Sequence, residues 1–138
     1  MKLQILTNPK EEIKGYKTYN LGQINLISEE VADNECESII ASNTLNLFSE
    51  QEVINFLNLL VGKLRIGGEL VVSGIEQRLL CKNILLGTID QTTVNQIILQ
   101  SRSIVDQELV NQFLQSVNLQ IEHSKISGIT YEIRAKRK

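Results

Sequence analysis

The sequence predicts an α/β fold, in which a mostly parallel central sheet is covered by helices and ends in an antiparallel hairpin. Three observations support this: short β-prone apolar runs in the first half, a long amphipathic helix in the middle, and two alternating segments at the end. Strands that alternate with helices favour a parallel sheet covered on both faces. The length of 138 residues suits one domain spanning residues 1–138.

The first half of the chain contains four short runs with the composition of strands. Leu3, Ile5 and Leu6 form a short apolar run that stops at Asn8-Pro9, which favours a buried strand followed by a turn. Residues 16–20, 23–27 and 38–42 are also β-prone, and the acidic stretch 28–37 is expected to be a solvated loop.

Residues 49–64 carry the clearest helix signal. Ser49-Glu50-Gln51-Glu52 has the form of a capping box, in which the Ser49 hydroxyl and the Glu52 carboxylate accept from each other's backbone amides. Apolar residues then recur every three or four positions from Val53 to Leu64, and such a stripe must pack on a sheet or on another helix. We expect Gly67-Gly68 to end this segment and residues 69–73 to form the next strand.

The second half is expected to contain three more helices and the hairpin. Residues 76–102 have roughly helical spacing with a break at Gly87-Thr88, which indicates two helices, and Asp106 suits the N-cap of a helix over 107–117. Residues 119–123 and 129–134 alternate with period two around Ser127-Gly128, as an antiparallel pair does. The core residues expected from these patterns are Ile5, Ile39, Ile40, Leu57, Leu60, Val71, Val72, Phe113 and Ile133.

The charge distribution argues against a broad nucleic-acid-binding face. The formal net charge is -2, and basic residues cluster only in a C-terminal tail of Arg134, Lys136, Arg137 and Lys138. This tail could contact nucleic acid or an acidic partner, although a solvated terminus explains it as simply.

The cysteines and the single histidine suggest no metal or catalytic centre. Cys36 and Cys81 form no CxxC pair and no Cys/His cluster, and two free thiols suit a reducing compartment. The N-terminus lacks the apolar core of a signal peptide and no run is long enough to span a membrane, so we expect a cytoplasmic protein with no membrane partner. His123 shares the register of Leu119 and Ile121, which predicts a partly buried strand residue.

Several segments, in order, resemble a family of small class I methyltransferases associated with surface-polysaccharide gene clusters. The matching segments are residues 1–10 for the first strand, Gly15-Tyr16 through Asn20, residues 33–42, and the Lys63-Leu64-Arg65-Ile66-Gly67-Gly68 turn. Residues 49–64 fit the helix before that turn, and residues 106–138 fit the closing helix and hairpin. The resemblance implies a reduced Rossmann-like class I methyltransferase fold with S-adenosylmethionine as its cofactor.

The resemblance also implies where a cofactor would bind, and this chain departs from the family there. The family-equivalent positions are Leu6, Thr7, Asn8, Asn20, Ser42 and Asn43. Where the family has a glycine-rich loop, this chain has Leu6-Thr7-Asn8-Pro9-Lys10, and Asn20 replaces the acidic residue that binds the ribose. The family's histidines fall on Asn43 and Leu47, neither of which can carry a proton at neutral pH.

Three functions are consistent with these residues. The loss of the glycine loop, the acidic residue and the histidines favours a degenerate methyltransferase-like domain that acts as a binding, scaffold or regulatory module for a protein or small molecule. The alternative is an active methyltransferase that holds S-adenosylmethionine through a divergent loop. A nucleic-acid binder that uses the basic tail is the third. Residues 43–46 follow a predicted strand and are open to two interpretations, a substrate loop or a turn with helix-cap chemistry.

Overall fold

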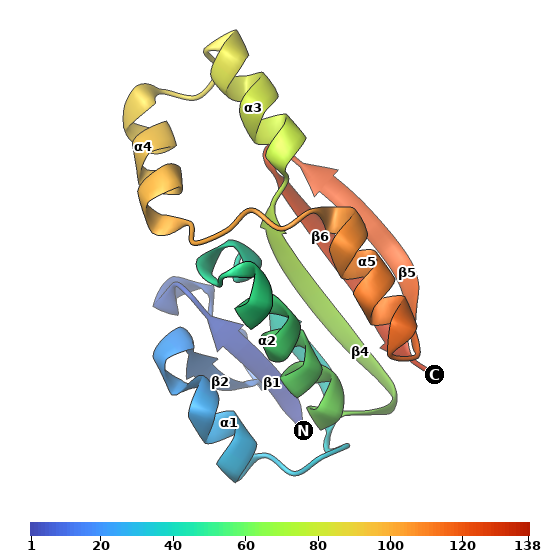
Figure 1. Ribbon diagram of the computed structural model, residues 1–138. Helices are drawn as coiled ribbons and strands as arrows, with labels where there is room; N and C mark the ends of the chain where they lie inside the picture. Colours follow the sequence, from blue (N-terminus) through green and yellow to red (C-terminus); the bar gives the residue numbers. More distant parts are fainter.

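The six strands form one mixed sheet, seen in a computed structural model that describes residues 1–138 (Figure 1). Their spatial order is β2-β1-β3-β4-β6-β5, where β1 is Lys2–Leu6, β2 Lys17–Asn20, β3 Cys36–Ala41, β4 Leu64–Ile75, β5 Leu119–Ser127 and β6 Thr130–Arg137. β1 to β4 are parallel, whereas β6 is antiparallel to both of its neighbours, β4 and β5. The predicted sheet, mostly parallel with a C-terminal antiparallel hairpin, is confirmed.

Five helices and three short 3-10 turns connect the strands. The helices are α1 Ile24–Glu30, α2 Glu50–Lys63, α3 Gln77–Leu86, α4 Gln91–Gln100 and α5 Gln107–Ser116, and the turns are Pro9–Glu11, Leu21–Gln23 and Leu45–Leu47. α1, α2 and α5 lie on the same face of the sheet, while α3 and α4 extend beyond the carboxyl end of β4 (Figure 1). None of the helices combines the length and the hydropathy needed to cross a membrane.

Helices cover one face of the sheet, so the expectation of helices on both faces is wrong. Leu3 and Ile39 pair in register and belong to the core that also contains Leu57 of α2. Neighbouring residues of a strand point to opposite faces. On the opposite face Arg134 is exposed, and its Nε lies 2.9 Å from Oε1 of Glu69. No helix covers this opposite face, because the connection between β1 and β2 contains only the short 3-10 turn Pro9–Glu11.

The assignment of residues 23–27 to a strand is wrong, because Gln23 ends a 3-10 turn and residues 24–27 begin α1. Ile24 is half-buried, while Ile27 and Val31 are fully packed, a spacing of three and four residues that suits α1. A five-residue apolar run cannot distinguish the two structures by period alone. The predicted acidic loop 28–37 is correspondingly reduced, because its first residues complete α1 and its last two begin β3.

The capping box of α2 is confirmed, whereas its predicted end is not. The Ser49 hydroxyl accepts from the Glu52 amide at 3.3 Å, and Glu52 Oε2 accepts from the Ser49 amide at 3.4 Å. The helix ends at Lys63 and the chain enters β4 directly, ahead of the glycines. Gly67 has a φ of +78°, and a Cβ on Gly68 would lie 2.8 Å from the Arg65 carbonyl oxygen. Both glycines therefore shape a bend inside β4.

The elements predicted in the second half are confirmed, with one correction at His123. α3 and α4 are separated at Gly87, which has a φ of +68°, and the Asp106 carboxylate caps α5. His123 is exposed on the edge strand β5, so the prediction of a partly buried residue is wrong. The cause is an irregularity between Ile121 and His123 that breaks the alternation on which that prediction relied.

Most of the predicted core is confirmed. Ile40 and Phe113 are the exceptions, since both are only partly buried. Ile40 pairs with Val71 on the sheet face that no helix covers. The fully packed members of the core cluster are Ile5, Ile39, Leu57, Leu60, Val72 and Ile133, whereas Val71 is buried outside that cluster.

Candidate functional site

The structure brings the six predicted cofactor residues to one edge of the sheet. Leu6 and Asn20 are register partners at the carboxyl ends of β1 and β2. Thr7 and Asn8 follow β1, while Ser42 and Asn43 follow the neighbouring parallel strand β3. The carboxyl edge of a parallel sheet is where α/β folds bind ligands. The six positions therefore share one edge of the sheet, and their role in cofactor binding stays a prediction.

Two backbone amides of the loop after β1 donate within the loop. Asn8 Oδ1 accepts from the Lys10 amide and the Asn8 carbonyl accepts from the Glu11 amide, each at 3.1 Å. Pro9 has no amide hydrogen. Only a three-residue 3-10 turn follows, so the loop lacks the helix N-terminus whose free amides attract an anion.

A buried glutamine fixes the chain beyond this turn. The Gln4 side chain accepts from the Ile13 amide and donates to the Glu11 carbonyl, both at 2.8 Å. Tyr16 and Ser38 add a hydroxyl–hydroxyl bond of 3.0 Å. Gln4 stands between Leu3 and Ile5, which face the helices, so it points to the opposite face. The segment after β1 therefore lies over the open face of the sheet.

The turn after β3 is held by hydrogen bonds within the protein. Asn43 adopts a φ of +55°, and its amide donates to Ser73 Oγ at 2.6 Å. The buried Thr44 hydroxyl donates to the Ala41 carbonyl at 2.9 Å. Of the two interpretations of residues 43–46, this geometry supports the turn. Asn46 continues the pattern, because its carbonyl accepts from the Arg102 amide at 2.8 Å.

A groove of about 420 Å³ runs along this edge. Thr7 and Asn43 line it, together with residues that sequence reasoning missed because β4, α4 and the hairpin turn deliver them from distant positions. None of its lining side chains is ionisable: they are Thr7, Asn43, Asn46, Leu47, Ile75, Gln100, Ile129 and Thr130. The groove thus contains no group able to transfer a proton at neutral pH.

Two other concave regions flank the edge. Ser42, Asn43 and Lys125 help to line a polar pocket of about 180 Å³, where burial raises the pKa of Tyr131 above its usual range and keeps the phenol neutral. A mainly apolar slot of about 390 Å³ lies between α1 and α2, and its walls include the stacked rings of Phe48 and Phe56 with centroids 4.5 Å apart.

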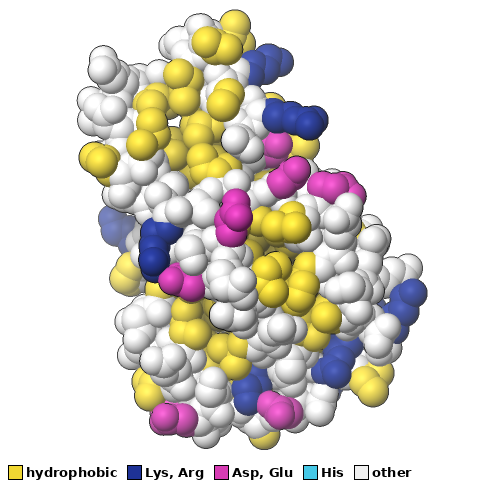
Figure 2. Space-filling model, viewed as in Figure 1, with side chains coloured by type: hydrophobic (Ala, Val, Ile, Leu, Met, Phe, Trp, Pro, Cys, Tyr) yellow, Lys and Arg dark blue, Asp and Glu magenta, His cyan; other side chains and the backbone are white.

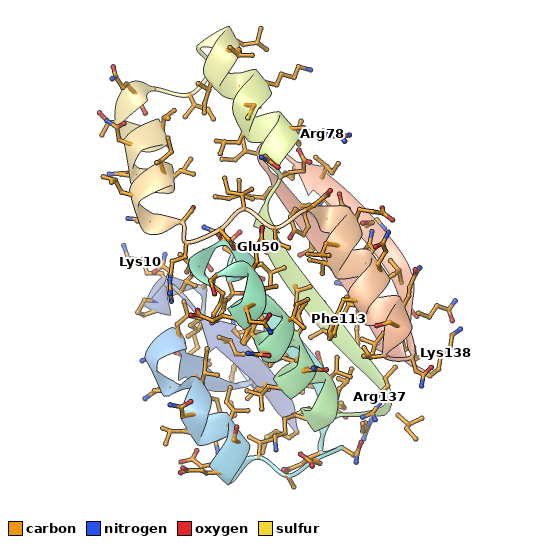
Figure 3. The ribbon with its side chains drawn as sticks, in the orientation of Figure 1. Lys10, Glu50, Arg78, Phe113, Arg137 and Lys138 are labelled. Atoms are coloured by element: carbon orange, nitrogen blue, oxygen red, sulfur yellow. The ribbon has the colours of Figure 1, made fainter.

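Part of the basic tail is committed to contacts inside the chain. The Arg137 guanidinium donates to the Leu64 and Val61 carbonyls and to Asn34 Oδ1, which places it beside the C-terminal end of α2 (Figure 3). Arg134 pairs with Glu69 on the open sheet face. Two of the four cations expected in a solvated tail therefore have structural partners. No group of His, Cys, Asp and Glu residues forms a possible metal site.

Comparison with known proteins yields structural similarity alone. No protein-family model and no curated protein sequence matches the chain. Among solved structures, a methyltransferase dependent on S-adenosylmethionine (SAM) from Archaeoglobus fulgidus superposes with a TM-score of 0.66 at 11% identity, over 96% of this chain and 74% of that one. One from Aquifex aeolicus gives 0.56 at 12% identity, over 96% and 79%.

A third similar structure contains S-adenosylhomocysteine (SAH). It is magnesium protoporphyrin IX methyltransferase from Synechocystis PCC 6803 with bound SAH, and it superposes with a TM-score of 0.59 at 12% identity. The match covers 89% of this chain and about half of that one, 51%. At these identities the likeness concerns the fold: this chain has the Rossmann-like fold of class I SAM-dependent methyltransferases.

Proposed function

We propose that this chain is a methyltransferase-like domain that does not transfer methyl groups and acts as a binding, scaffold or regulatory module. We further propose that residues 1–138 form one domain and that it resides in the cytoplasm, where its two free cysteines would stay reduced. A kinship with the methyltransferases of surface-polysaccharide gene clusters is part of the same proposal and rests on the sequence motifs described above.

The hydrogen bonding of the loop after β1 is the observation that carries the proposal. A cofactor with a charged methionine end needs free backbone amides there. The amides of Lys10, Glu11 and Ile13 already donate to Asn8 and Gln4, and Pro9 has none. The loop therefore offers the methionine end of SAM only the Thr7 and Asn8 amides and no helix N-terminus, which makes it a poor fit.

The ribose position supports the same conclusion. Asn20 is exposed at the end of β2 and offers a neutral amide where a carboxylate would accept two charge-assisted hydrogen bonds. The lost glycine loop, the lost carboxylate and the lost histidines each remove about 1–3 kcal/mol, so together they move the dissociation constant of a micromolar site toward or beyond millimolar.

One observation favours the alternative, an active methyltransferase with a divergent loop. The groove of about 420 Å³ lies at the carboxyl edge of the sheet and has Thr7 and Asn43 in its wall. Cofactor affinity can come from backbone and shape as well as from side chains. The absence of an ionisable lining residue would limit such an enzyme to reactions that need no proton transfer from the protein.

Calorimetric titration of the unmodified protein with SAM, and separately with SAH, tests the proposal. We expect no saturable heat at micromolar ligand and no rise in melting temperature, because bound ligand stabilises the folded state by mass action. A micromolar dissociation constant, accompanied by amide NMR shifts at Leu6, Asn20 and Asn43, would contradict the proposal and favour the active enzyme.

A further inference from the structure

A row of polar side chains crosses the open face of the sheet. Ser73 of β4 pairs with Glu132 of β6, and Glu132 pairs in turn with Lys125 of β5. Register partners point to the same face of a sheet, which here is the face that carries the Glu69–Arg134 ion pair. This face lies behind the sheet in Figure 1 and Figure 2, where the helices are in front. All three residues of the row line the polar pocket of about 180 Å³.

Hydroxyl groups surround this row. Ser73 is 6% exposed, and its oxygen accepts from the Asn43 amide at 2.6 Å, but its hydroxyl hydrogen has no acceptor in the protein. Thr130 Oγ1 donates to the Ser127 carbonyl at 2.9 Å, so its lone pairs remain available to a ligand. The Ser42 hydroxyl also lines the pocket. Because a buried donor without an acceptor costs free energy, a ligand atom that accepts from Ser73 would be favourable.

The two charged residues of the pocket are both without an ionic partner. Lys125 and Glu132 are cross-strand neighbours, yet neither takes part in any ion pair of the structure. Lys125 is exposed, whereas Glu132 is half-buried and has lost part of its hydration. The pocket therefore offers a ligand one cationic group, one anionic group and several hydroxyls.

The size and the charge of the pocket narrow the class of ligand. Its volume of about 180 Å³ equals that of about six water molecules at about 30 Å³ each, whereas drug-sized ligands occupy about 300–1,000 Å³. A nucleotide is therefore too large. A simple anion would meet the Glu132 carboxylate and a simple amine would meet the Lys125 ammonium, so either would be repelled by one charge of the pocket. A small ligand that carries both charges satisfies both groups.

We propose that this pocket binds an α-amino acid with a short polar side chain. The Glu132 carboxylate would accept from the ammonium group of the ligand, and the Lys125 ammonium would donate to its carboxylate. The Ser73 hydroxyl would donate to an oxygen of the ligand's side chain. This inference goes beyond the proposed function and does not depend on it, since it holds whether or not SAM binds at the neighbouring edge.

NMR titration of the full chain with L-serine, without SAM and at constant ionic strength, tests the ligand class. We expect saturable amide shifts at Asn43, Ser73 and Thr130 with a millimolar dissociation constant, as suits so small a ligand. Ethanolamine is serine without the carboxylate, and 3-hydroxypropionate is serine without the ammonium group. Each should bind about three- to tenfold more weakly than L-serine, because one charged group of the pocket then has no partner.

Variants of the two charged residues assign each contact. Glu132→Gln should bind L-serine no better than 3-hydroxypropionate, because the ammonium group is no longer recognised, and Lys125→Met should bind it no better than ethanolamine. Glu122→Gln and Lys136→Met are the matched controls, since both residues are exposed on the same hairpin and lie outside the pocket. These controls should bind L-serine as the wild type does, and far-UV circular dichroism would verify that all four variants fold.

Three outcomes would overturn the proposal. The first is the absence of saturable shifts with L-serine up to about 50 mM, which is well above a millimolar dissociation constant. The second is equal binding of L-serine and its two single-charge analogues by the wild type. The third is an equal effect of the pocket variants and the control variants, which would place the ligand elsewhere on the protein.

Discussion

The Lys63 ammonium lies 2.7 Å from the Asp33 carboxylate, and the two ions differ sharply in exposure. The Lys63 side chain, in the last turn of α2, is 9% exposed, whereas that of Asp33 is 74% exposed. The cation therefore depends on its partner more than the anion does, because a buried charge without a counterion loses its hydration uncompensated. The C-terminal position in α2 adds a favourable interaction with the helix dipole.

Removing the two partners should have unequal effects. Asp33→Ala leaves the buried cation unpaired and should cost about 1–3 kcal/mol in the free energy of unfolding. Lys63→Met keeps the apolar stem, removes the charge and should cost less than about 1 kcal/mol. Urea denaturation measures both, and Asp33→Ala in the Lys63→Met background serves as the control, with no further loss expected. Equal costs for the two single variants would show that the asymmetry in exposure has no energetic consequence.

Truncation of Leu57 tests the face on which α2 packs. Leu57 is fully buried against the sheet, so Leu57→Ala should lower the free energy of unfolding by about 2–5 kcal/mol through lost transfer energy and a residual cavity. Ile66→Ala, at an exposed position, is the control and should change it by less than about 0.5 kcal/mol. Similar values for the two variants in urea denaturation would mean that the α2 interface is wrongly described.

The Tyr19 hydroxyl controls the ionisation of Glu30. It donates to Glu30 Oε2 at 2.6 Å, and this hydrogen bond, with help from the nearby Lys17 charge, lowers the pKa of Glu30 below its ordinary value. A folded-state pKa that is lowered stabilises the protein above the unfolded pKa, and the stabilisation is lost as the pH falls through the folded pKa.

Tyr19→Phe should therefore raise the pKa of Glu30 toward the ordinary value of about 4.3. The difference in stability between wild type and variant should shrink as the pH falls from about 6 to about 3. Carboxyl NMR titration of Glu30, with denaturation at both pH values, measures these effects. Lys17→Gln is the comparison variant, with a smaller expected rise. An unchanged Glu30 pKa in Tyr19→Phe would exclude the hydrogen bond as the main cause.

The elements that the sequence predicted well are those with a long period or an explicit cap. α2 combines a capping box with a stripe over four turns, and β6 alternates between buried and more exposed residues. Residues 23–27 were too short to reveal a period, so α1 was missed. The choice of sheet face was unpredictable for a different reason, since it depends on long-range packing of α1, α2 and α5 on the same side.

The candidate site was predictable in position but not in its hydrogen bonding. Leu6 and Asn20 end parallel strands and Asn43 follows a third, and parallel strands bring their carboxyl ends together. The Gln4 side chain bonds the backbone of Glu11 and Ile13, and these contacts depend on a chain reversal that no local sequence pattern encodes. The one available signal was the polar Gln4 inside an apolar strand, because a buried amide needs partners.

The final prediction concerns restoration of the cofactor loop. Thr7→Gly and Pro9→Gly supply backbone freedom, and Asn20→Asp returns a carboxylate to the end of β2. We expect the triple variant still to show no micromolar binding of SAM in calorimetry. The three substitutions leave Gln4 in place, and its side chain would continue to accept from the Ile13 amide and to hold the segment on the open face of the sheet.

The same titration on a quadruple variant that adds Gln4→Val separates the loop chemistry from the path of the chain. Removing the amide releases Glu11 and Ile13, but it cannot create a helix after β1, because only the three-residue turn Pro9–Glu11 stands there. Without a helix N-terminus the cofactor's carboxylate lacks its aligned donors, so the quadruple variant should also fail to bind at micromolar concentration. Micromolar binding of SAM by the triple variant, without Gln4→Val, would contradict this prediction. It would show that the loop residues and the missing ribose carboxylate fully account for the lost cofactor affinity.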